Sequence, residues 1–439
     1  MKKPRLAVDF CGVRFPNPFV LAAAPPTDSA EMIARGFDAG WGGAVVKTLG
    51  LEHVEVNLVS PMMAGLKYED KNLVGLENID LISDRDIREV LPEVADLKKR
   101  YPENVLIVSM MAAAEDEWKE IARRVQDAGA DMIECSFSCP HGMPERGMGS
   151  AVGQDADLTY ERARWVVEAV DIPVLIKLTP NVTDMRPIAL KVKDAGAAGV
   201  TAINTVKALL GFDLETFAPL PSVWGKSTAG GYSGPAVKPI ALRFVADVAK
   251  DVGIPVAGVG GVVTWKDGVE FLLAGAGIVQ VSTAVMRYGY DIIEELTEGL
   301  ELYLEDKGLE SPADLVGKGL PNIVSHEQLS REHKVVASVD EDLCIGCGAC
   351  VIACRDGGHQ AIEFRGSRPE DTRTEGPESA DDQRPGAGSG DGGGVESGAT
   401  PEERIPVVDD EKCIGCGFCR TVCPVDGCLT MKSREPVGA

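Results

Sequence analysis

Short apolar runs recur along the first 305 residues of the chain, and stretches with the apolar spacing of amphipathic helices separate them. Each run is apolar almost throughout, as in strands of a parallel sheet that is covered on both faces. Helical segments such as EDEWKEIARRVQDAG and DMRPIALKVKDAG lie between the runs. The pattern predicts eight strands, which are FVLAAA from Phe19, GAVVKT from Gly43, NVLIVSMM from Asn104, DMIECSFS from Asp131, PVLIKLT from Pro173, GVTAINT from Gly199, PVAGVGG from Pro255 and IVQVSTAV from Ile278.

A repeated glycine supports this division into strand and helix units. DAGWGGAVV, DAGADMIEC, DAGAAGVTA and LAGAGIVQV each place a glycine between a helical stretch and an apolar run. The four residues are Gly40, Gly129, Gly196 and Gly275. Glycine suits the left-handed position just after a helix. Eight such units favour a closed (β/α)8 TIM barrel at residues 1–305, with an open doubly wound sheet as the alternative.

Polar residues follow or end several of the predicted strands. TIM barrels carry their chemistry at the carboxyl ends of the strands. The fourth strand continues into a glycine-rich loop, ECSFSCPHGMPERGMGSAVGQ, which puts Cys139 at the mouth of the barrel. Lys47 ends the second strand, Lys177 lies in the fifth, and Asn204 and Thr205 end the sixth. These side chains are expected to meet at one site.

The remainder of the chain changes in character. Residues 306–340 are expected to form a connector that lies back over the barrel, and residues 341–432 a second domain. Within it, residues 365–404 contain nine glycines, ten acidic residues and a single Val, with no Leu, Ile, Met or aromatic residue. Such a segment buries too little apolar surface to offset its ordering entropy, so we expect a disordered insert.

Two cysteine runs carry the strongest signal, because CIGCGACVIAC and CIGCGFCRTVC both have the spacing C-x2-C-x2-C-x3-C. This spacing is typical of ferredoxins with two 4Fe–4S clusters, in which the fourth cysteine of each run binds the other cluster. Zinc is the alternative, but zinc sites use four ligands in pairs. The spacing predicts two ligand sets, which are Cys344, Cys347, Cys350 and Cys423 for one cluster and Cys413, Cys416, Cys419 and Cys354 for the other.

The net charge and the lengths of the apolar stretches limit the partners and the cellular location expected for the protein. The formal net charge of −24 excludes nucleic acid and anionic membranes as expected partners, because these need clustered Lys and Arg. No apolar stretch approaches the ~20 residues that span a bilayer, and no signal-peptide pattern follows the first residues. We therefore expect a cytoplasmic protein, in which cysteines are metal ligands or catalytic thiols.

The clusters imply a flavin. Clusters move electrons singly, whereas organic substrates usually take a hydride, and a flavin converts between the two. TIM barrels bind phosphate in the loops after strands seven and eight. Here these loops contain GVGG at 258–261 and VST at 281–283, so FMN is the expected cofactor.

These motifs together resemble one enzyme family. The resemblance rests on the segments AGWGGAVVKT, ENIDLIS, SCPHGMPERGMGSAVGQ, KLTPNVTD, INTV and GYSGPAVKPIALR and on the two cysteine runs. The chain resembles the FMN and iron–sulfur subunit of NAD-dependent dihydropyrimidine dehydrogenases, over nearly its whole length apart from the insert. Its barrel is also similar to dihydroorotate dehydrogenase.

The resemblance implies reduction of uracil or thymine to the 5,6-dihydropyrimidine. Hydride would reach C6 of the ring and Cys139 would protonate C5 as the general acid. A thiol suits this step, because its ordinary pKa of about 8.5 keeps it protonated at neutral pH. The alternative for Cys139 is a buried structural cysteine, which is the preferred interpretation of Cys135. Cys11 and Cys428 have no assigned role.

The resemblance also implies binding residues. Those expected at FMN are Ala22, Ala23, Lys47, Thr48, Lys177, Gly234, Gly260, Gly261, Ser282 and Thr283. Those expected at the pyrimidine are Asn78, Ser136, Ser138, Asn204 and Thr205. The family has Asn where this chain has Ser136, and a substrate amide left unpaired costs roughly 1–3 kcal/mol, so the substrate could differ.

The chain has no credible dinucleotide-binding motif, since its only G-x-G-x-x-G match lies in the acidic insert. The resemblance therefore implies a separate flavoprotein subunit that binds NAD(H) and docks near the ferredoxin-like domain. One alternative function is oxidation of the ring, as in dihydroorotate dehydrogenase, although no dedicated arginine for a carboxylate is expected at the mouth. The other is an electron carrier with a non-catalytic barrel.

Overall fold

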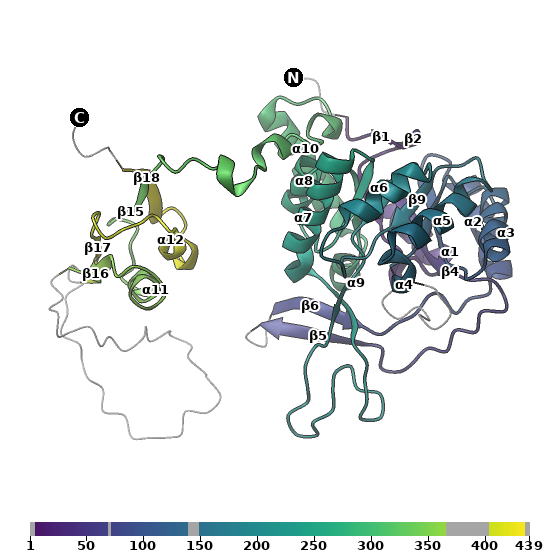
Figure 1. The fold of residues 1–439 in the computed structure, drawn as a ribbon, viewed down its shortest axis with the longest axis horizontal. Helices are drawn as coiled ribbons and strands as arrows, with labels where there is room; N and C mark the ends of the chain where they lie inside the picture. The colour runs from purple at the N-terminus through teal and green to yellow at the C-terminus, as the bar shows by residue number, and fades with distance from the viewer. Residues whose placement is uncertain (1–4, 69–71, 139–148, 366–403, 435–439) are drawn as a thin grey trace. The chain divides into compact units, whose positions relative to one another are not determined.

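The structure is a computed structural model that describes residues 5–68, 72–138, 149–365 and 404–434. It forms two compact units, residues 1–323 and 324–439 (Figure 1). The division between them falls inside the expected connector. The predicted acidic insert lies outside the described residues, apart from its two ends, Arg365 and Arg404.

The first unit is built on a closed barrel of parallel strands, which confirms the predicted TIM-barrel fold. The order around the barrel is β10-β13-β14-β3-β4-β7-β8-β9, so neighbours in sequence are neighbours in space. All eight predicted apolar runs contain or adjoin one of these strands. In chain order the strands are β3 (Phe19–Leu21), β4 (Gly43–Leu49), β7 (Val105–Met110), β8 (Met132–Ser136), β9 (Val174–Lys177), β10 (Gly199–Ala202), β13 (Val256–Val259) and β14 (Ala276–Val281).

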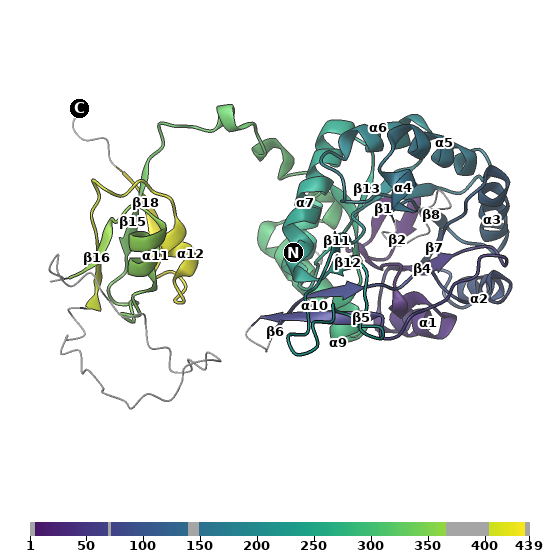
Figure 2. The same ribbon diagram turned by 60° about the horizontal axis from the view of Figure 1, so that its bottom comes forward.

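Helices surround this barrel (Figure 2). The longer ones are α1 (Ala30–Ala39), α2 (Ile87–Arg100), α3 (Glu115–Asp127), α5 (Ala156–Val167), α6 (Arg186–Asp194), α7 (Lys238–Asp247), α8 (Trp265–Leu273) and α10 (Ile292–Lys307). Two shorter helices are α4 (Ser150–Gly153) and α9 (Thr283–Tyr288), and α7 continues into a π-helical turn, η4 (Val248–Val252). The glycines predicted to follow helices adopt positive φ, with +112° at Gly40, +86° at Gly129, +85° at Gly196 and +101° at Gly275. Their predicted left-handed conformation is confirmed.

A small hairpin fills the amino end of the barrel. Its strands are β1 (Val8–Phe10) and β2 (Val13–Phe15). Phe10 and Phe15 pack with inward side chains of the barrel strands, including Val45 and Ile107. Because this end is closed by apolar packing, any site inside the barrel must open at the carboxyl end.

A four-stranded antiparallel sheet in the order β11-β12-β6-β5 was not anticipated from the sequence. Its strands are β5 (Met63–Tyr68), β6 (Asn72–Asn78), β11 (Val206–Ala208) and β12 (Gly230–Ser233). It joins the chain after β4 to the chain after β10, and Asn78 lies opposite Gly231 across the β6–β12 pair. Figures 1 and 2 show the β5–β6 hairpin beside the barrel.

Residues after α10 still pack on the barrel unit. The short helices η5 (Pro312–Asp314) and η6 (Leu320–Asn322) lie here. Leu315 is buried, and the N–H groups of Gly317 and Gly319 donate to the carbonyl oxygens of Leu272 and Leu273 at the end of α8. None of the helices in the described ranges has the length and apolar character needed to cross a membrane.

The second unit begins with the short helix η7 (His326–Gln328) and forms two small antiparallel ribbons with one helix each. β15 (Val335–Val339) pairs with β18 (Leu429–Ser433), and β16 (Ile362–Phe364) pairs with β17 (Pro406–Val408). Helices α11 (Ala349–Gly357) and α12 (Phe418–Val422) contact each other. The small core between them includes Cys350 and Cys419.

Candidate active site

Alternation along the barrel strands explains where the polar side chains lie. Successive residues of a strand face opposite sides, so the inward positions can be followed from one end to the other. Near the amino end they are apolar and packed together, as in Val20, Val45, Ile107, Met132, Leu175 and Ile278. Two residues further along the same strands come Ala22, Lys47, Ser109, Glu134, Lys177 and Gln280, all buried. The interior therefore changes from apolar to polar toward the carboxyl end.

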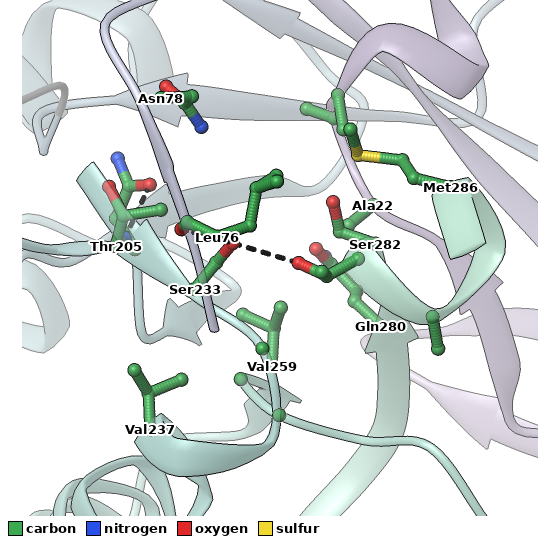
Figure 3. A pocket seen from close by; sticks show the side chains of 18 of the residues that line it. Ala22, Leu76, Asn78, Thr205, Ser233, Val237, Val259, Gln280, Ser282 and Met286 are labelled. Atoms are coloured by element: carbon green, nitrogen blue, oxygen red, sulfur yellow. Dashed lines mark hydrogen bonds between the residues drawn. The ribbon is translucent and has the colours of Figure 1, made fainter. Parts of the chain in front are cut away.

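A cavity of about 1380 Å³, measured to its open mouth, lies at this end. Fourteen of the expected binding residues line it, which are Ala22, Ala23, Lys47, Thr48, Asn78, Ser136, Lys177, Asn204, Thr205, Gly234, Gly260, Gly261, Ser282 and Thr283. Figure 3 shows Asn78 and Thr205 on one side of it and Gln280 and Ser282 on the other. Ser138 is not in the lining. Cys139 lies outside the described residues.

Two buried ammonium groups face the cavity, each paired with a carboxylate. Lys47 Nζ lies 3.0 Å from Asp80 Oδ2, and both side chains are less than a tenth exposed. Lys177 Nζ lies 3.1 Å from Glu134 Oε1. A buried charge is tolerated when it is paired and hydrogen-bonded. The two pairs therefore hold positive charge at fixed positions inside the barrel.

Glu134 was not singled out from the sequence, although it joins four strands. It is completely buried, and its Oε2 accepts from Thr201 Oγ1 at 2.8 Å and from Gln280 Nε2 at 3.0 Å. Gln280 Oε1 has no partner among the described residues and is buried beside the cavity. Strand alternation could have identified it from the sequence, because Glu134 is two positions before Ser136 and so lies on the same inward face of β8.

The amide residues on the other side are held by their own hydrogen bonds. Asn204 donates from Nδ2 to Ser138 Oγ at 2.9 Å and accepts the Thr205 N–H at Oδ1. Asn181 donates to Thr179 Oγ1 and accepts the Lys207 N–H, so it fixes the loop rather than the pocket. Asn204 keeps one N–H proton and one lone pair for a ligand.

Close backbone packing at three glycines shapes another part of the lining. Gly234, Gly260 and Gly261 have φ of +99°, +135° and +78°. A Cβ on Gly261 would lie 2.8 Å from Lys238 N and 2.9 Å from Gly234 O, so no other residue fits there. Thr283 Oγ1 donates to Ser233 Oγ at 2.8 Å. Small residues, hydroxyl groups and exposed backbone N–H groups of this kind suit a phosphate group.

An arginine also lines the cavity. Arg287 belongs to α9, which follows Ser282, and its Nη1 donates to the Leu73 carbonyl oxygen at 3.0 Å. It therefore lies toward the end formed by α9. The donor set as a whole, with two ammonium groups, a glycine cradle and hydroxyl groups, fits FMN.

One thiol and one carboxyl group near the site are buried, and burial raises the pKa of both. Cys135 is fully buried among side chains that pack between the barrel and its helices, and burial raises its pKa well above the ordinary value. The preferred structural interpretation of Cys135 is confirmed. Glu77, next to Asn78, is also buried, and burial raises its pKa while the N–H groups of Gly230 and Leu210 oppose the shift. Its Oε2 has no partner within the described part of the chain, and its Oε1 accepts the Gly230 N–H.

The second unit contains two cysteine-lined cavities. The first is lined by Cys344, Cys347, Cys350, Cys423 and Cys428. The second is lined by Cys354, Cys413, Cys416 and Cys419. The fourth cysteine of each run thus lies with the first three of the other run. Among the described residues, no three His, Cys, Asp or Glu side chains converge closely enough for a single metal ion.

Known proteins match both units. The dihydroorotate dehydrogenase family matches residues 5–304, and the 4Fe-4S dicluster domain matches residues 343–427. The NAD-dependent dihydropyrimidine dehydrogenase subunit PreA of Escherichia coli is 46% identical over 84% of this chain and 89% of its own length.

Two further relatives are named as a dihydropyrimidine dehydrogenase and a dihydroorotate dehydrogenase. The chloroplastic dihydropyrimidine dehydrogenase (NADP(+)) of Arabidopsis thaliana is 39% identical over 76% of this chain and 81% of its own length. The catalytic subunit of dihydroorotate dehydrogenase B (NAD(+)) of Pyrococcus abyssi is 38% identical over 72% of this chain and 99% of its own length. The matching families bind FMN in the barrel and two 4Fe–4S clusters in the C-terminal domain. The chain is thus an oxidoreductase that belongs to the dihydroorotate dehydrogenase family, with a 4Fe–4S dicluster domain joined to its barrel.

Proposed function

We propose that the chain is the catalytic subunit of a dihydropyrimidine dehydrogenase that reduces uracil or thymine to the 5,6-dihydropyrimidine. Electrons would come from an NAD(P)H-oxidising partner through the two clusters. The observation that carries the proposal is one cavity in which amide side chains, two buried ammonium groups and a glycine cradle converge. The names of the Escherichia coli and Arabidopsis relatives support the same reaction.

The pyrimidine would bind to Asn78, Asn204 and Thr205. Amide groups match the alternating N–H and C=O groups of the ring edge. Asn204 is oriented in advance by its bonds to Ser138 and to the Thr205 N–H, which reduces the ordering cost of binding. Ser136 would complete this set with one hydroxyl group, and Ser138 would act through Asn204.

Lys47 and Lys177 would lie against FMN, with Ala22, Ala23 and Thr48 packing beside it. Bound FMN supplies hydride chemistry and the exchange between single electrons and pairs. The two ammonium groups favour its reduced, anionic form by charge attraction. Gly234, Gly260, Gly261, Ser282 and Thr283 would hold its phosphate with backbone N–H and hydroxyl groups.

Cys139 would protonate C5 of the ring. Cys135, four residues earlier, is an unsuitable acid because it is fully buried on the other face of β8. A thiol with an ordinary pKa of about 8.5 is protonated at neutral pH and can still release its proton.

The partner would dock on the ferredoxin-like unit in a cytoplasmic hetero-oligomer. Ile345 and Ile414 occupy the same position in the two CIGC turns and are 67% and 61% exposed, and Phe418 is 45% exposed. Apolar side chains grouped at a surface mark protein contacts. The subunit name of the Escherichia coli relative supports a partner.

An anaerobic assay on the photoreduced chain tests the reaction without the partner. Uracil, thymine and orotate are added separately, and the flavin absorbance and the products are followed. We expect rapid reoxidation with uracil or thymine and formation of the dihydropyrimidine. Cys139→Ala should abolish this turnover while the clusters stay reducible. Reoxidation by orotate alone would favour the dihydroorotate dehydrogenase reaction, and turnover unaffected by Cys139→Ala would exclude this residue as the acid.

A further inference from the structure

The two halves of the second unit differ at one buried position beside the clusters. Ala361 directly precedes β16 and Cys428 directly precedes β18, each shortly after the last cysteine of a run. They are 2% and 3% exposed. The two halves repeat the same ribbon and helix, so these residues are equivalent. Only one of the two halves therefore carries a fifth thiol.

Cys428 lies in the first cluster cavity. It lines that cavity together with Cys344 and Cys423. Its S–H donates to the Asp340 carbonyl oxygen across a long distance of 3.7 Å. Its backbone is fixed on both sides, because its carbonyl oxygen accepts the Asp340 N–H at 2.8 Å and its N–H donates to the Val425 carbonyl oxygen at 3.3 Å. The backbone of Cys428 is therefore held at the wall of the cavity.

The second cavity lacks this thiol but keeps the backbone contact. The Ala361 N–H donates to Cys354 Sγ at 3.3 Å, and its methyl side chain lines the cavity. Each cluster already has four cysteine ligands in the assignment above, which is a complete set. Cys428 is therefore surplus as a ligand, and the difference between the halves needs another explanation.

A surplus thiol can act as a donor. A thiol that binds no iron keeps its S–H, which is a weak hydrogen-bond donor. Hydrogen bonds to cluster sulfurs are among the features that set the reduction potential. Reduction adds negative charge to the cluster and its sulfurs, so an S–H donor stabilises the reduced form more than the oxidised form.

We propose that Cys428 donates a hydrogen bond to the cysteine sulfurs of the cluster held by Cys344, Cys347, Cys350 and Cys423 and thereby raises the reduction potential of that cluster. The two clusters are then unequal, and a single electron on the chain resides mainly on the first. The inference rests on the proposed ligand assignment and is independent of the substrate.

Redox titration of the substrate-free, full-length protein, followed by electron paramagnetic resonance, tests this. Cys428→Ala copies the alanine of the other half, and it should lower one midpoint potential and leave the other unchanged. We expect the reduction equilibrium constant of that cluster to fall about threefold to tenfold, and tenfold corresponds to about 59 mV for one electron. Cys428→Ser keeps a donor and should shift the potential less.

The reciprocal variant Ala361→Cys adds a thiol at the second cavity and should raise the potential of the other cluster. Cys11→Ala is the matched control, because this half-buried thiol of the barrel unit donates to the Ala198 carbonyl oxygen at 3.2 Å. It should change neither potential. Iron and sulfide content should stay constant in all variants.

Two results would overturn the proposal. If both potentials are unchanged in Cys428→Ala, the thiol does not tune the cluster. If Cys428→Ala loses the iron of one cluster, Cys428 is a ligand and not a donor. Neither measurement uses a pyrimidine, so a wrong substrate assignment would leave both readouts intact.

Discussion

Removing the carboxylate of Glu134 should leave Lys177 as an unpaired buried charge. Glu134 is fully buried and binds Lys177, Thr201 and Gln280 from three other strands. Glu134→Gln has the same shape but no charge, and its amide would place two donors opposite these donors. Breaking a buried pair by removing one partner costs about 3–5 kcal/mol. At about 2 °C per kcal/mol for a large domain, the barrel should unfold roughly 6–10 °C lower.

The double variant Glu134→Gln/Lys177→Met separates the cost of an unpaired charge from the loss of the ion pair itself. With both charges gone, the interior holds no unpaired ion, so the double variant should be more stable than Glu134→Gln alone. Thermal unfolding is followed by circular dichroism at saturating FMN, since bound cofactor stabilises the folded state. The control is Asp157→Asn, whose pair with Lys191 is exposed and should matter little.

A midpoint that Glu134→Gln lowered no more than Asp157→Asn does would refute a stabilising role for the buried ion pair. This role would also be refuted if the double variant were as unstable as the sum of the two single variants. Either result would mean that water or rearranged side chains solvate the Lys177 ammonium group. The ion pair would then contribute little to the stability of the barrel.

Three other predictions concern the cofactors and the substrate. Gly261→Ala should weaken FMN binding at least about tenfold in a fluorescence titration, whereas Gly129→Ala has similar φ but open space around its Cβ and should bind FMN normally. Ser136→Asn should tighten uracil binding by about one to two powers of ten, seen in the flavin difference spectrum, and unchanged affinity would show that position 136 does not face the substrate. Cys354→Ser should remove the cluster held by Cys413, Cys416 and Cys419, so its iron content and resonance spectrum should match those of Cys413→Ser.

Several features were readable from sequence because they depend on short stretches of chain. The eight strands follow from continuous apolar runs, and the left-handed glycines follow from their place at helix ends. The pairing of Cys354 with the second cysteine run and of Cys423 with the first follows from the ferredoxin spacing, and the two cavities are lined accordingly. Chemistry of this kind is set by residues a few positions apart.

The four-stranded sheet could not be predicted in the same way. Its strands β5 and β11 are partly exposed and carry mixed residues, so neither period two nor a continuous apolar run identifies them. What holds them is pairing with β6 and β12, which lie far away in sequence. This pairing brings Asn78 to the same cavity as Thr205.

The sequence by itself determined the barrel, the two cysteine sets and the residue types that gather at the mouth. Only the tertiary structure decided that Glu134 joins Lys177, Thr201 and Gln280, that Asp80 pairs with Lys47, and that Cys428 adds a fifth thiol to one cavity. The physical reason is that a hydrogen bond or an ion pair depends on distance in space. Closure of the barrel brings together the strands that carry Glu134, Lys177, Thr201 and Gln280, whereas Asp80 and Cys428 lie on segments outside the barrel strands.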